Sequence, residues 1–247
     1  MPRSIKDERV LLYAFTCGYI TLPTNYFIGG EEGKTKVPAC VFLIDHPDGL
    51  ALFDTGFSDR FVGLEKGLGK IVDMPPEHPV ADRLRELEVD PAQIKWIINS
   101  HLHLDHAGGN NMLPNATVIV QDSEWEFGFS PEDGAYTTED FDTGQTVKRM
   151  IGEHDLFGDG SVILFPTPGH TPGHQSARVR TATGEAVLAG DCCNSCRHCA
   201  VPGHRYFSGM IPTSGPRCRR LKRSTLVPDI RGSLPITIVA SQPARAM

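Results

Sequence analysis

The sequence predicts a layered α/β domain followed by a C-terminal segment of different composition. Short apolar runs bounded by turn residues alternate with an amphipathic helix, as is typical of layered α/β folds. The chain has 247 residues, 40% hydrophobic and 22% charged, so it can bury a sizeable core, unlike a disordered protein. Residues 1–191 hold 15 basic and 29 acidic side chains, a net of −14, whereas residues 192–247 hold nine basic and one acidic, a net of +8. We therefore expect one domain over residues 1–191 and a poorly ordered basic tail over residues 192–247.

The first part of the chain predicts three strands and a helix. An apolar run over Val10–Phe15 suits a strand. Two further apolar runs, over Val37–Ile44 and Leu50–Asp54, flank the turn residues of 45–49 and predict a hairpin. Pro79–Glu88 places apolar side chains at helical spacing with charges on the other face, so we expect a helix there.

The second part predicts further strands around an irregular segment. The expected strands are Ile94–Asn99, Thr117–Gln121, Val162–Phe165, Gln175–Arg180 and Glu185–Ala189. Residues 122–160 are acidic and irregular, and their pattern predicts no definite element. The tail shows little periodicity before Leu234–Val239.

The most informative segment lies directly after the strand expected at Ile94–Asn99. It holds four side chains that can bind a metal within six residues, namely His101, His103, Asp105 and His106. Imidazole and carboxylate ligands suit zinc, iron and manganese. A single histidine in a polar loop is usually an ordinary surface residue, but three histidines and an aspartate at this spacing favour a metal site.

A second histidine motif follows another apolar strand. Two Pro-Gly-His turns in tandem fix His170 and His174 on a rigid loop. Asp191 directly follows the apolar strand expected at Glu185–Ala189 and Gly190. A carboxylate at that strand end could bridge two cations, although taken alone it would be an ordinary helix cap.

In this order and spacing the motifs resemble the metallo-β-lactamase superfamily of hydrolases, over residues 10–191 and including the early aspartate motif Leu52–Gly56. The resemblance implies a four-layer αβ/βα sandwich, incomplete at the C-terminus, with a site at one edge of the sheets. It implies two zinc ions, the first held by His101, His103 and His170. Asp105 and His106 would belong to the second ion, Asp191 would bridge the two, and His174 would be a supporting neighbour.

Within the superfamily, the sequences of these motifs most resemble those of N-acyl-homoserine lactonases. Val37–Ile44 and the continuation Gln175-Ser176 favour that branch, whereas glyoxalase II shares both histidine motifs and is the enzymatic alternative. The lactonase resemblance implies quorum quenching, in which a metal-bound hydroxide opens the lactone ring and Asp105 shuttles a proton. The expected partner is a small lactone or thioester, not a nucleic acid or a membrane. The N-terminal residues show no apolar signal region, so we expect a cytoplasmic protein.

The tail departs from the lactonase pattern. Lactonases carry a further metal-binding histidine near the C-terminus and a tyrosine three residues after the bridging aspartate. Here only His198 and His204 follow Asp191, and Asn194 stands at the tyrosine position. The Arg-, Pro-, Ser- and Cys-rich composition favours a frameshifted C-terminus beginning near residues 192–196, with a metal-binding module of Cys193, Cys196 and Cys199 as the alternative. We therefore expect that this chain hydrolyses lactones slowly, or that it is an inactive relative of the lactonases.

Overall fold

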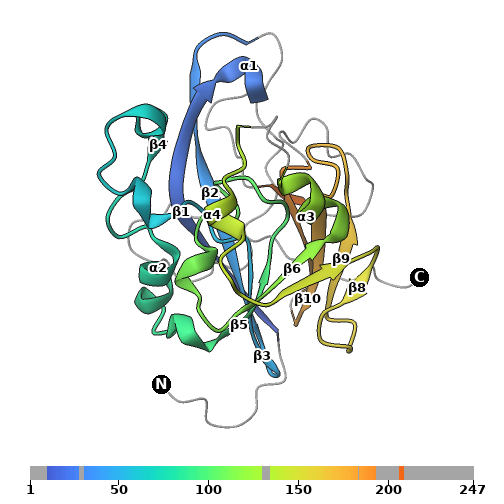
Figure 1. The fold of residues 1–247 in the computed structure, drawn as a ribbon. Helices are drawn as coiled ribbons and strands as arrows, with labels where there is room; N and C mark the ends of the chain where they lie inside the picture. Colours follow the sequence, from blue (N-terminus) through green and yellow to red (C-terminus); the bar gives the residue numbers. More distant parts are fainter. Residues whose placement is uncertain (1–9, 28–30, 130–133, 183, 193–205, 209–247) are drawn as a thin grey trace, which may run out of the picture.

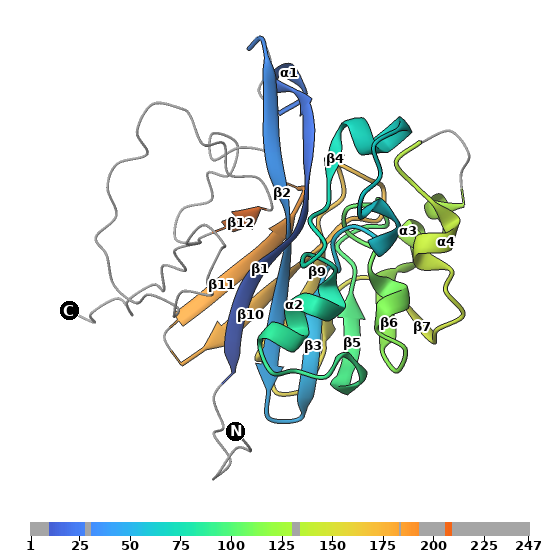
Figure 2. The same ribbon diagram turned by 90° about the vertical axis from the view of Figure 1, so that its left-hand side faces the viewer.

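Two β-sheets stacked face to face form the centre of the structure, a computed structural model that describes residues 10–27, 31–129, 134–182, 184–192 and 206–208. Within these residues, the first sheet has seven strands in the order β4-β1-β2-β3-β5-β6-β7, and the second has five in the order β12-β11-β10-β9-β8. Helices cover the outer face of the first sheet (Figures 1 and 2). The described residues thus form three of the four layers expected, and the mixed α/β fold class is confirmed.

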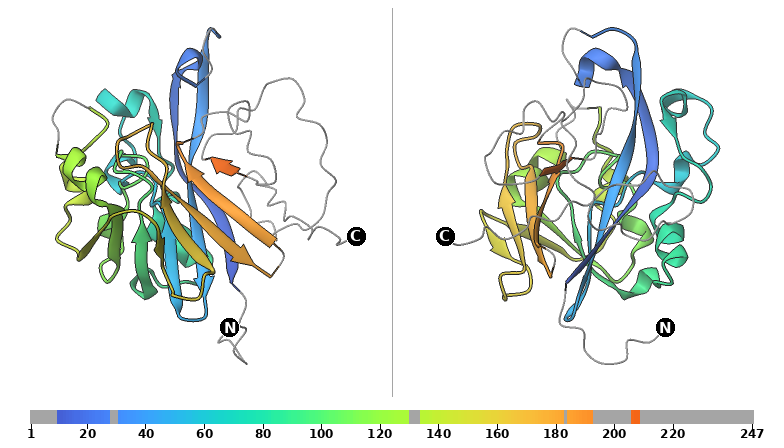
Figure 3. Two further views of the ribbon diagram at one scale, coloured as in Figure 1. Left: turned by 90° about the vertical axis from the view of Figure 1, so that its right-hand side faces the viewer. Right: turned by 180° about the vertical axis from the view of Figure 1, so that it is seen from behind.

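A long hairpin begins the first sheet. β1 (Leu11–Pro23) pairs antiparallel with β2 (Lys34–His46), and β2 turns into β3 (Gly49–Phe53) as the turn residues predict. β1 is longer than the strand expected at Val10–Phe15, because β2 continues to pair with it beyond a bulge between Thr16 and Tyr19. The short helix α1 (Thr24–Phe27) lies at the far end of this hairpin (Figure 3).

The middle of the chain crosses the helical layer and then returns to the sheet. It holds the 3₁₀ turns Asp59–Phe61, Gly67–Lys70, Pro91–Gln93 and Asn110–Met112, the strand β4 (Val72–Asp73) and the helix α2 (Val80–Glu86). β5 (Ile94–Ile98) and β6 (Thr117–Gln121) then join β3 as parallel strands. The bounds of α2, β5 and β6 agree with the sequence pattern to within two residues at each end, whereas the 3₁₀ turns and β4 were not predicted.

The segment that the sequence left unassigned folds into four short elements. These are α3 (Asp122–Gly128), α4 (Thr138–Phe141), β7 (Val147–Met150) and β8 (His154–Asp155). β7 extends the first sheet and β8 begins the second. Each element is at most seven residues long, too short for a hydrophobic period to be recognised.

The second sheet contains β9 (Val162–Pro166), β10 (Gln175–Thr181) and β11 (Gly184–Gly190) in antiparallel order. β12 (Tyr206–Ser208) pairs parallel with β11, so the tail contributes a strand where its composition indicated none. Leu234–Val239, where periodicity resumes, lies outside the described residues.

Two apolar clusters hold the layers together. Between the sheets, Phe42, Phe53 and Ile98 pack against Leu164 and Leu188. On the opposite face of the first sheet, Val80 and Leu84 of α2 pack onto the side chains of β2, β3 and β5. No helix within the described ranges is long and apolar enough to cross a bilayer.

Candidate metal centre

Three strand ends bring the predicted ligands to one edge of the stacked sheets. The first histidine loop follows β5, the second joins β9 to β10, and Asp191 follows β11. Gln175 ties these segments together: its Nε2 donates to the Asn99 carbonyl at 2.8 Å, and its Oε1 accepts from Gln121 at 3.0 Å. The two loops are therefore fixed to each other beside the site by buried amide groups.

The predicted ligands form two groups of three that share His101. Ligand atoms of His101, His103 and His170 lie within 4.8 Å of one another, and so do those of His101, His106 and Asp191. His101 is fully buried, and its Nε2 has no hydrogen-bond partner among the described residues. Burying an unpaired polar nitrogen is unfavourable, so the donor set fits a transition-metal ion better than it fits a purely structural cluster.

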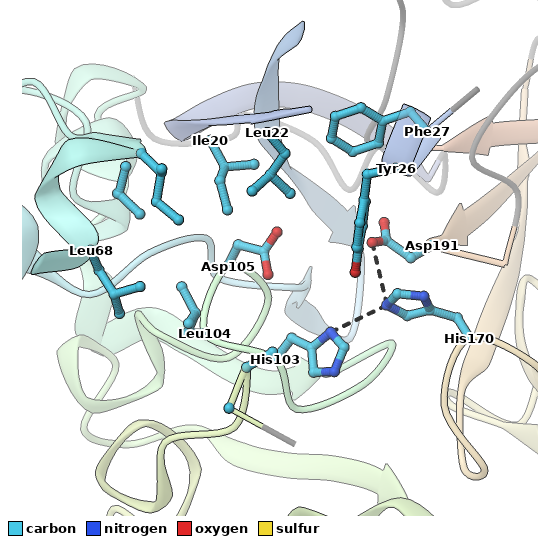
Figure 4. A pocket seen from close by; sticks show the side chains of 14 residues that line it. Ile20, Leu22, Tyr26, Phe27, Leu68, His103, Leu104, Asp105, His170 and Asp191 are labelled. Atoms are coloured by element: carbon cyan, nitrogen blue, oxygen red, sulfur yellow. Dashed lines mark hydrogen bonds and ion pairs between the residues drawn. The ribbon is translucent and has the colours of Figure 1, made fainter. Parts of the chain in front are cut away.

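Asp191 belongs to the second group and also faces the first. Its Oδ1 is 3.5 Å from His106 Nε2, and its Oδ2 is 3.6 Å from His170 Nε2. Figure 4 shows His170 between Asp191 and His103, with Asp105 across the same cavity. One carboxylate oxygen therefore faces each group, which is the arrangement that a bridging ligand needs.

Asp105 lies beside the groups of three without being a member of either. Its Oδ2 is 3.6 Å from His106 Nε2, and its side chain is 19% exposed, more than that of His106 or Asp191. It also lines the adjacent cavity. Its place at the boundary between the buried ligands and the open space suits a group that exchanges protons.

The charges within the cluster set the protonation of its histidines. Burial, followed by the neighbouring histidines, holds the pKa of His101 well below its ordinary value. Burial acts the same way on His106, but Asp105, Asp191 and Asp54 outweigh it and raise that pKa well above its ordinary value. The carboxylates around His106 therefore attract positive charge, whether a proton or a bound cation, while His101 stays a neutral donor.

Asp54 contacts the candidate ligands, although the sequence pattern assigned it no role. Its Oδ2 is 2.8 Å from His106 Nδ1, and it accepts hydrogen bonds from the Ser100 N–H at 2.7 Å and the Ser100 hydroxyl at 2.9 Å. Because Asp54 contacts Nδ1 of His106, the other ring nitrogen, Nε2, faces Asp105 and Asp191. The signal was present, because Asp54 closes β3 within the early aspartate motif.

His174 supports Asp191 and belongs to neither group. Its Nε2 accepts the Asp191 N–H at 3.1 Å, and its Nδ1 is 2.8 Å from the Thr167 hydroxyl. Burial lowers the pKa of His174 to about 3, so the imidazole remains neutral. Both nitrogens of His174 therefore have partners within the protein.

A cavity of about 230 Å³ opens onto the cluster. Its polar end is formed by His103, Asp105, His170 and Asp191. Its apolar wall comes from the β1–α1 segment and from the segment before β4, through Ile20, Leu22, Tyr26, Phe27, Leu68 and Ile71 (Figure 4). An apolar chain can therefore lie along the wall while a polar group reaches the ligands.

The cysteine and histidine positions of the tail cannot be placed in this site. Cys193, Asn194, Cys196, His198, Cys199 and His204 all lie outside the described residues. Cys192 is described and is a free thiol.

Comparison with known proteins agrees with this geometry. The chain is 36% identical over 173 residues to N-acyl homoserine lactonase AttM of Rhizobium radiobacter, covering 64% of this chain and 66% of the relative. It is 34% identical over 192 residues to the AttM protein of Azorhizobium caulinodans, covering 70% and 73%. The chain thus spans about two thirds of the length of these curated relatives.

The fold comparison points the same way. A solved N-acyl homoserine lactone hydrolase, with the product N-hexanoyl-L-homoserine bound at its catalytic metal center, has a TM-score of 0.68 and 28% identity. The alignment covers 76% of this chain and 77% of that one. Residues 35–193, which contain both histidine motifs and Asp191, match the metallo-beta-lactamase superfamily, whose fold implies bound metal ions. By sequence, fold and ligand arrangement together, the chain belongs to the metallo-beta-lactamase superfamily.

Proposed function

We propose that this chain is a metal-dependent hydrolase that opens the lactone ring of N-acyl-homoserine lactones. The observation that carries the proposal is the pair of ligand groups sharing His101 at the polar end of an apolar-walled cavity. The lactonases among its relatives support the substrate class, and they favour it over the thioester that glyoxalase II would take.

We infer that zinc is the metal and that two ions bind. His101, His103 and His170 would hold the first, Asp105 and His106 would belong to the second, and Asp191 would bridge them. Neutral imidazoles and carboxylates suit zinc. When bound, such ions lower the pKa of a water molecule and polarise a carbonyl oxygen.

The chain's own residues would bind and orient the substrate. The apolar wall, with Leu22, Phe27 and Leu68, would pack the acyl chain and exclude water. The lactone ring would then lie against His103, His170 and Asp191 at the polar end. Asp105, at the boundary of the cavity, would carry a proton to the alkoxide released when the ring opens.

The test is ring opening by the purified full chain. After loading with zinc, N-hexanoyl-homoserine lactone should be converted to the open acid, and a chelator should stop the reaction. His101→Ala should lose at least about 100-fold in rate, since it removes a donor common to both groups.

His154→Ala is the matched control, because His154 lies on β8, outside both ligand groups, and contacts Lys148. It should keep the rate of the unmodified chain. A zinc-loaded chain that cleaves an acyl thioester but no lactone would contradict the proposal. A zinc-loaded chain that cleaves neither would identify an inactive relative.

A further inference from the structure

Glu124, on α3, is a buried carboxylate outside both ligand groups. Glu124 is 0% exposed to solvent. One oxygen, Oε1, accepts the Leu102 N–H at 3.0 Å and the Tyr136 hydroxyl at 2.7 Å. The other, Oε2, accepts the Thr171 hydroxyl at 2.6 Å and the Gly173 N–H at 3.1 Å. The acceptor capacity of both oxygens is thus used by neutral donors.

Three of these four donors belong to the two histidine loops, and the fourth is Tyr136. Leu102 lies between His101 and His103 in the first loop, whereas Thr171 directly follows His170 and Gly173 directly precedes His174 in the second. Each carboxylate oxygen therefore holds one loop. The two loops are far apart in sequence, and Glu124 joins them through a single rigid group.

The partners of Glu124 also reach the ligands directly. The Tyr136 ring packs edge-on against His103, with ring centroids 4.6 Å apart. His103 Nδ1 in turn lies 3.2 Å from His170 Nε2, where the two loops meet. A shift of either loop on Glu124 would change the separation of these two imidazoles.

Glu124 has no ion-pair partner within the described part of the chain. Burying a carboxylate without a cation is unfavourable unless its oxygens are fully hydrogen-bonded. A neutral or apolar side chain could fill the same volume, but it would not accept from both loops at once. The charge is therefore best explained by the four donors that it orients.

We propose that Glu124 is a positioning residue that fixes the separation of the two histidine loops and thereby the affinity of the site for its first metal ion. This inference rests on the metal site of the proposed function, but not on its substrate. Glu124 touches neither the ligands nor the cavity and acts through Leu102, Tyr136, Thr171 and Gly173.

Glu124→Gln separates this role from simple packing. The amide keeps the shape of the carboxylate, but it has one oxygen and one NH₂ group. With the oxygen toward Leu102, the NH₂ faces the Gly173 N–H, and with the oxygen toward Gly173, it faces the Leu102 N–H. In either orientation one loop loses its backbone acceptor, while the volume at the site is unchanged.

Two further variants complete the design. Glu126→Gln makes the same chemical change on the same helix, but the Glu126 side chain is 66% exposed and pairs with Arg149. Thr171→Val removes a single hydroxyl donor from the second loop and leaves the carboxylate in place. It tests the proposal even if Glu124→Gln does not fold.

The experiment measures the apparent Kd of the full chain for Zn²⁺ by competition with a chelator, and the Tm with and without the metal. Glu124→Gln should weaken binding by about 10–100-fold and Thr171→Val by less, whereas Glu126→Gln should stay within about 3-fold of the unmodified chain. The increase in Tm that zinc produces should be smallest for Glu124→Gln, larger for Thr171→Val, and close to that of the unmodified chain for Glu126→Gln.

The outcomes separate this inference from the proposed function. If Glu124→Gln or Thr171→Val lowers the Tm equally with and without zinc and leaves the Kd unchanged, Glu124 only stabilises the fold and the inference is wrong. An unmodified chain that binds zinc with the expected order of variants, but opens no lactone, would overturn the proposed substrate and leave this inference standing. An unmodified chain that binds no zinc would overturn both.

Discussion

Asp54 combines an unusual backbone conformation with a central hydrogen-bonding role. Its φ of 61° lies in the left-handed region, which few residues other than glycine adopt. The conformation turns the chain at the end of β3 so that the carboxylate meets both Ser100 and His106. Burial raises the pKa of Asp54, but its hydrogen bonds and the His106 charge oppose this. Backbone strain at this residue is thus offset by the bonds that orient His106.

Asp54→Asn is expected to weaken the second metal position. Asparagine tolerates the left-handed conformation, so the backbone should be kept. Its NH₂ would face His106 Nδ1 and favour the tautomer with a proton on Nε2, the atom that faces Asp191. Zinc affinity at that position should fall by about 10–100-fold, measured by calorimetric titration. Asp48→Asn, at the 74% exposed Asp48 side chain in the β2–β3 turn, should leave both affinities unchanged.

Gly173→Ala should destabilise the second histidine loop. A Cβ added there would lie 2.1 Å from the Glu124 backbone nitrogen and 2.4 Å from its Cα, so neither side can move aside easily. We expect the free energy of unfolding to fall by about 1–3 kcal/mol, measured by denaturant titration. Gly134→Ala is the control, since an added Cβ there meets nothing within 4 Å. Equal stability of the two variants would contradict this account of the loop.

The β2–β3 turn contacts the loop between β8 and β9 through His46, Phe157 and Asp159, which we call the His46 clasp. The His46 ring stacks on Phe157, with centroids 3.6 Å apart, and its Nε2 is 3.1 Å from Asp159 Oδ2. Nδ1 of His46 accepts the Asp48 N–H at 3.0 Å, which leaves Nε2 to donate to Asp159. These contacts join the two sheets, because β2 and β3 belong to the first sheet and β8 and β9 to the second.

The His46 clasp makes a small contribution to the loss of unfolding free energy at low pH. Hydrogen bonding from Ser161 and then from His46 lowers the pKa of Asp159 to about 2. A lowered carboxylate pKa contributes stability above the unfolded-state value of about 3.9, and this is lost as the pH falls toward 2. Because the side chain is half exposed, the effect should stay under about 1 kcal/mol.

Asp159→Asn should therefore flatten part of the decline in unfolding free energy between pH 5 and pH 2, measured by urea titration at each pH. Asp142→Asn, at a residue outside this clasp, should retain the full slope. Identical slopes for Asp159→Asn and the unmodified chain would show that the clasp carries no pH dependence.

The net charge of the chain changes sign near residue 191, and the described strands continue beyond that point. β12 lies beyond it and pairs with β11 at the edge of the second sheet. We propose that residues 1–191 form the folded domain and that the basic segment after them is the more readily cleaved part. Limited proteolysis should remove the tail first and leave a resistant fragment ending near residue 191. A tail as resistant as the domain would favour the cysteine module instead.

The parts of the fold that could be predicted share a clear local pattern. β6 was expected at Thr117–Gln121 and has those bounds, because a buried parallel strand is a continuous apolar run. The β2–β3 hairpin followed from its turn residues. α3 and β7 were missed, because their few residues are held by tertiary contacts rather than by a hydrophobic period.

The site shows the same division. The candidate ligands could be predicted to lie together because histidines and aspartates at short spacing leave a local signal. Glu124 could not, because a single glutamate in an acidic segment carries no signal of its own. Its role depends on contacts with Leu102 and Thr171, which only the folded chain brings to it.

The zinc content of the purified chain tests whether Asp191 is common to two metal positions. Asp191 directs one oxygen toward His106 and the other toward His170, whereas His103 belongs to the first ligand group alone. After saturation with zinc and removal of the excess, the unmodified chain should hold two ions, His103→Ala about one, and Asp191→Ala less than His103→Ala. Asp191→Ala with the same zinc content as His103→Ala, or as the unmodified chain, would contradict the bridged pair of ions.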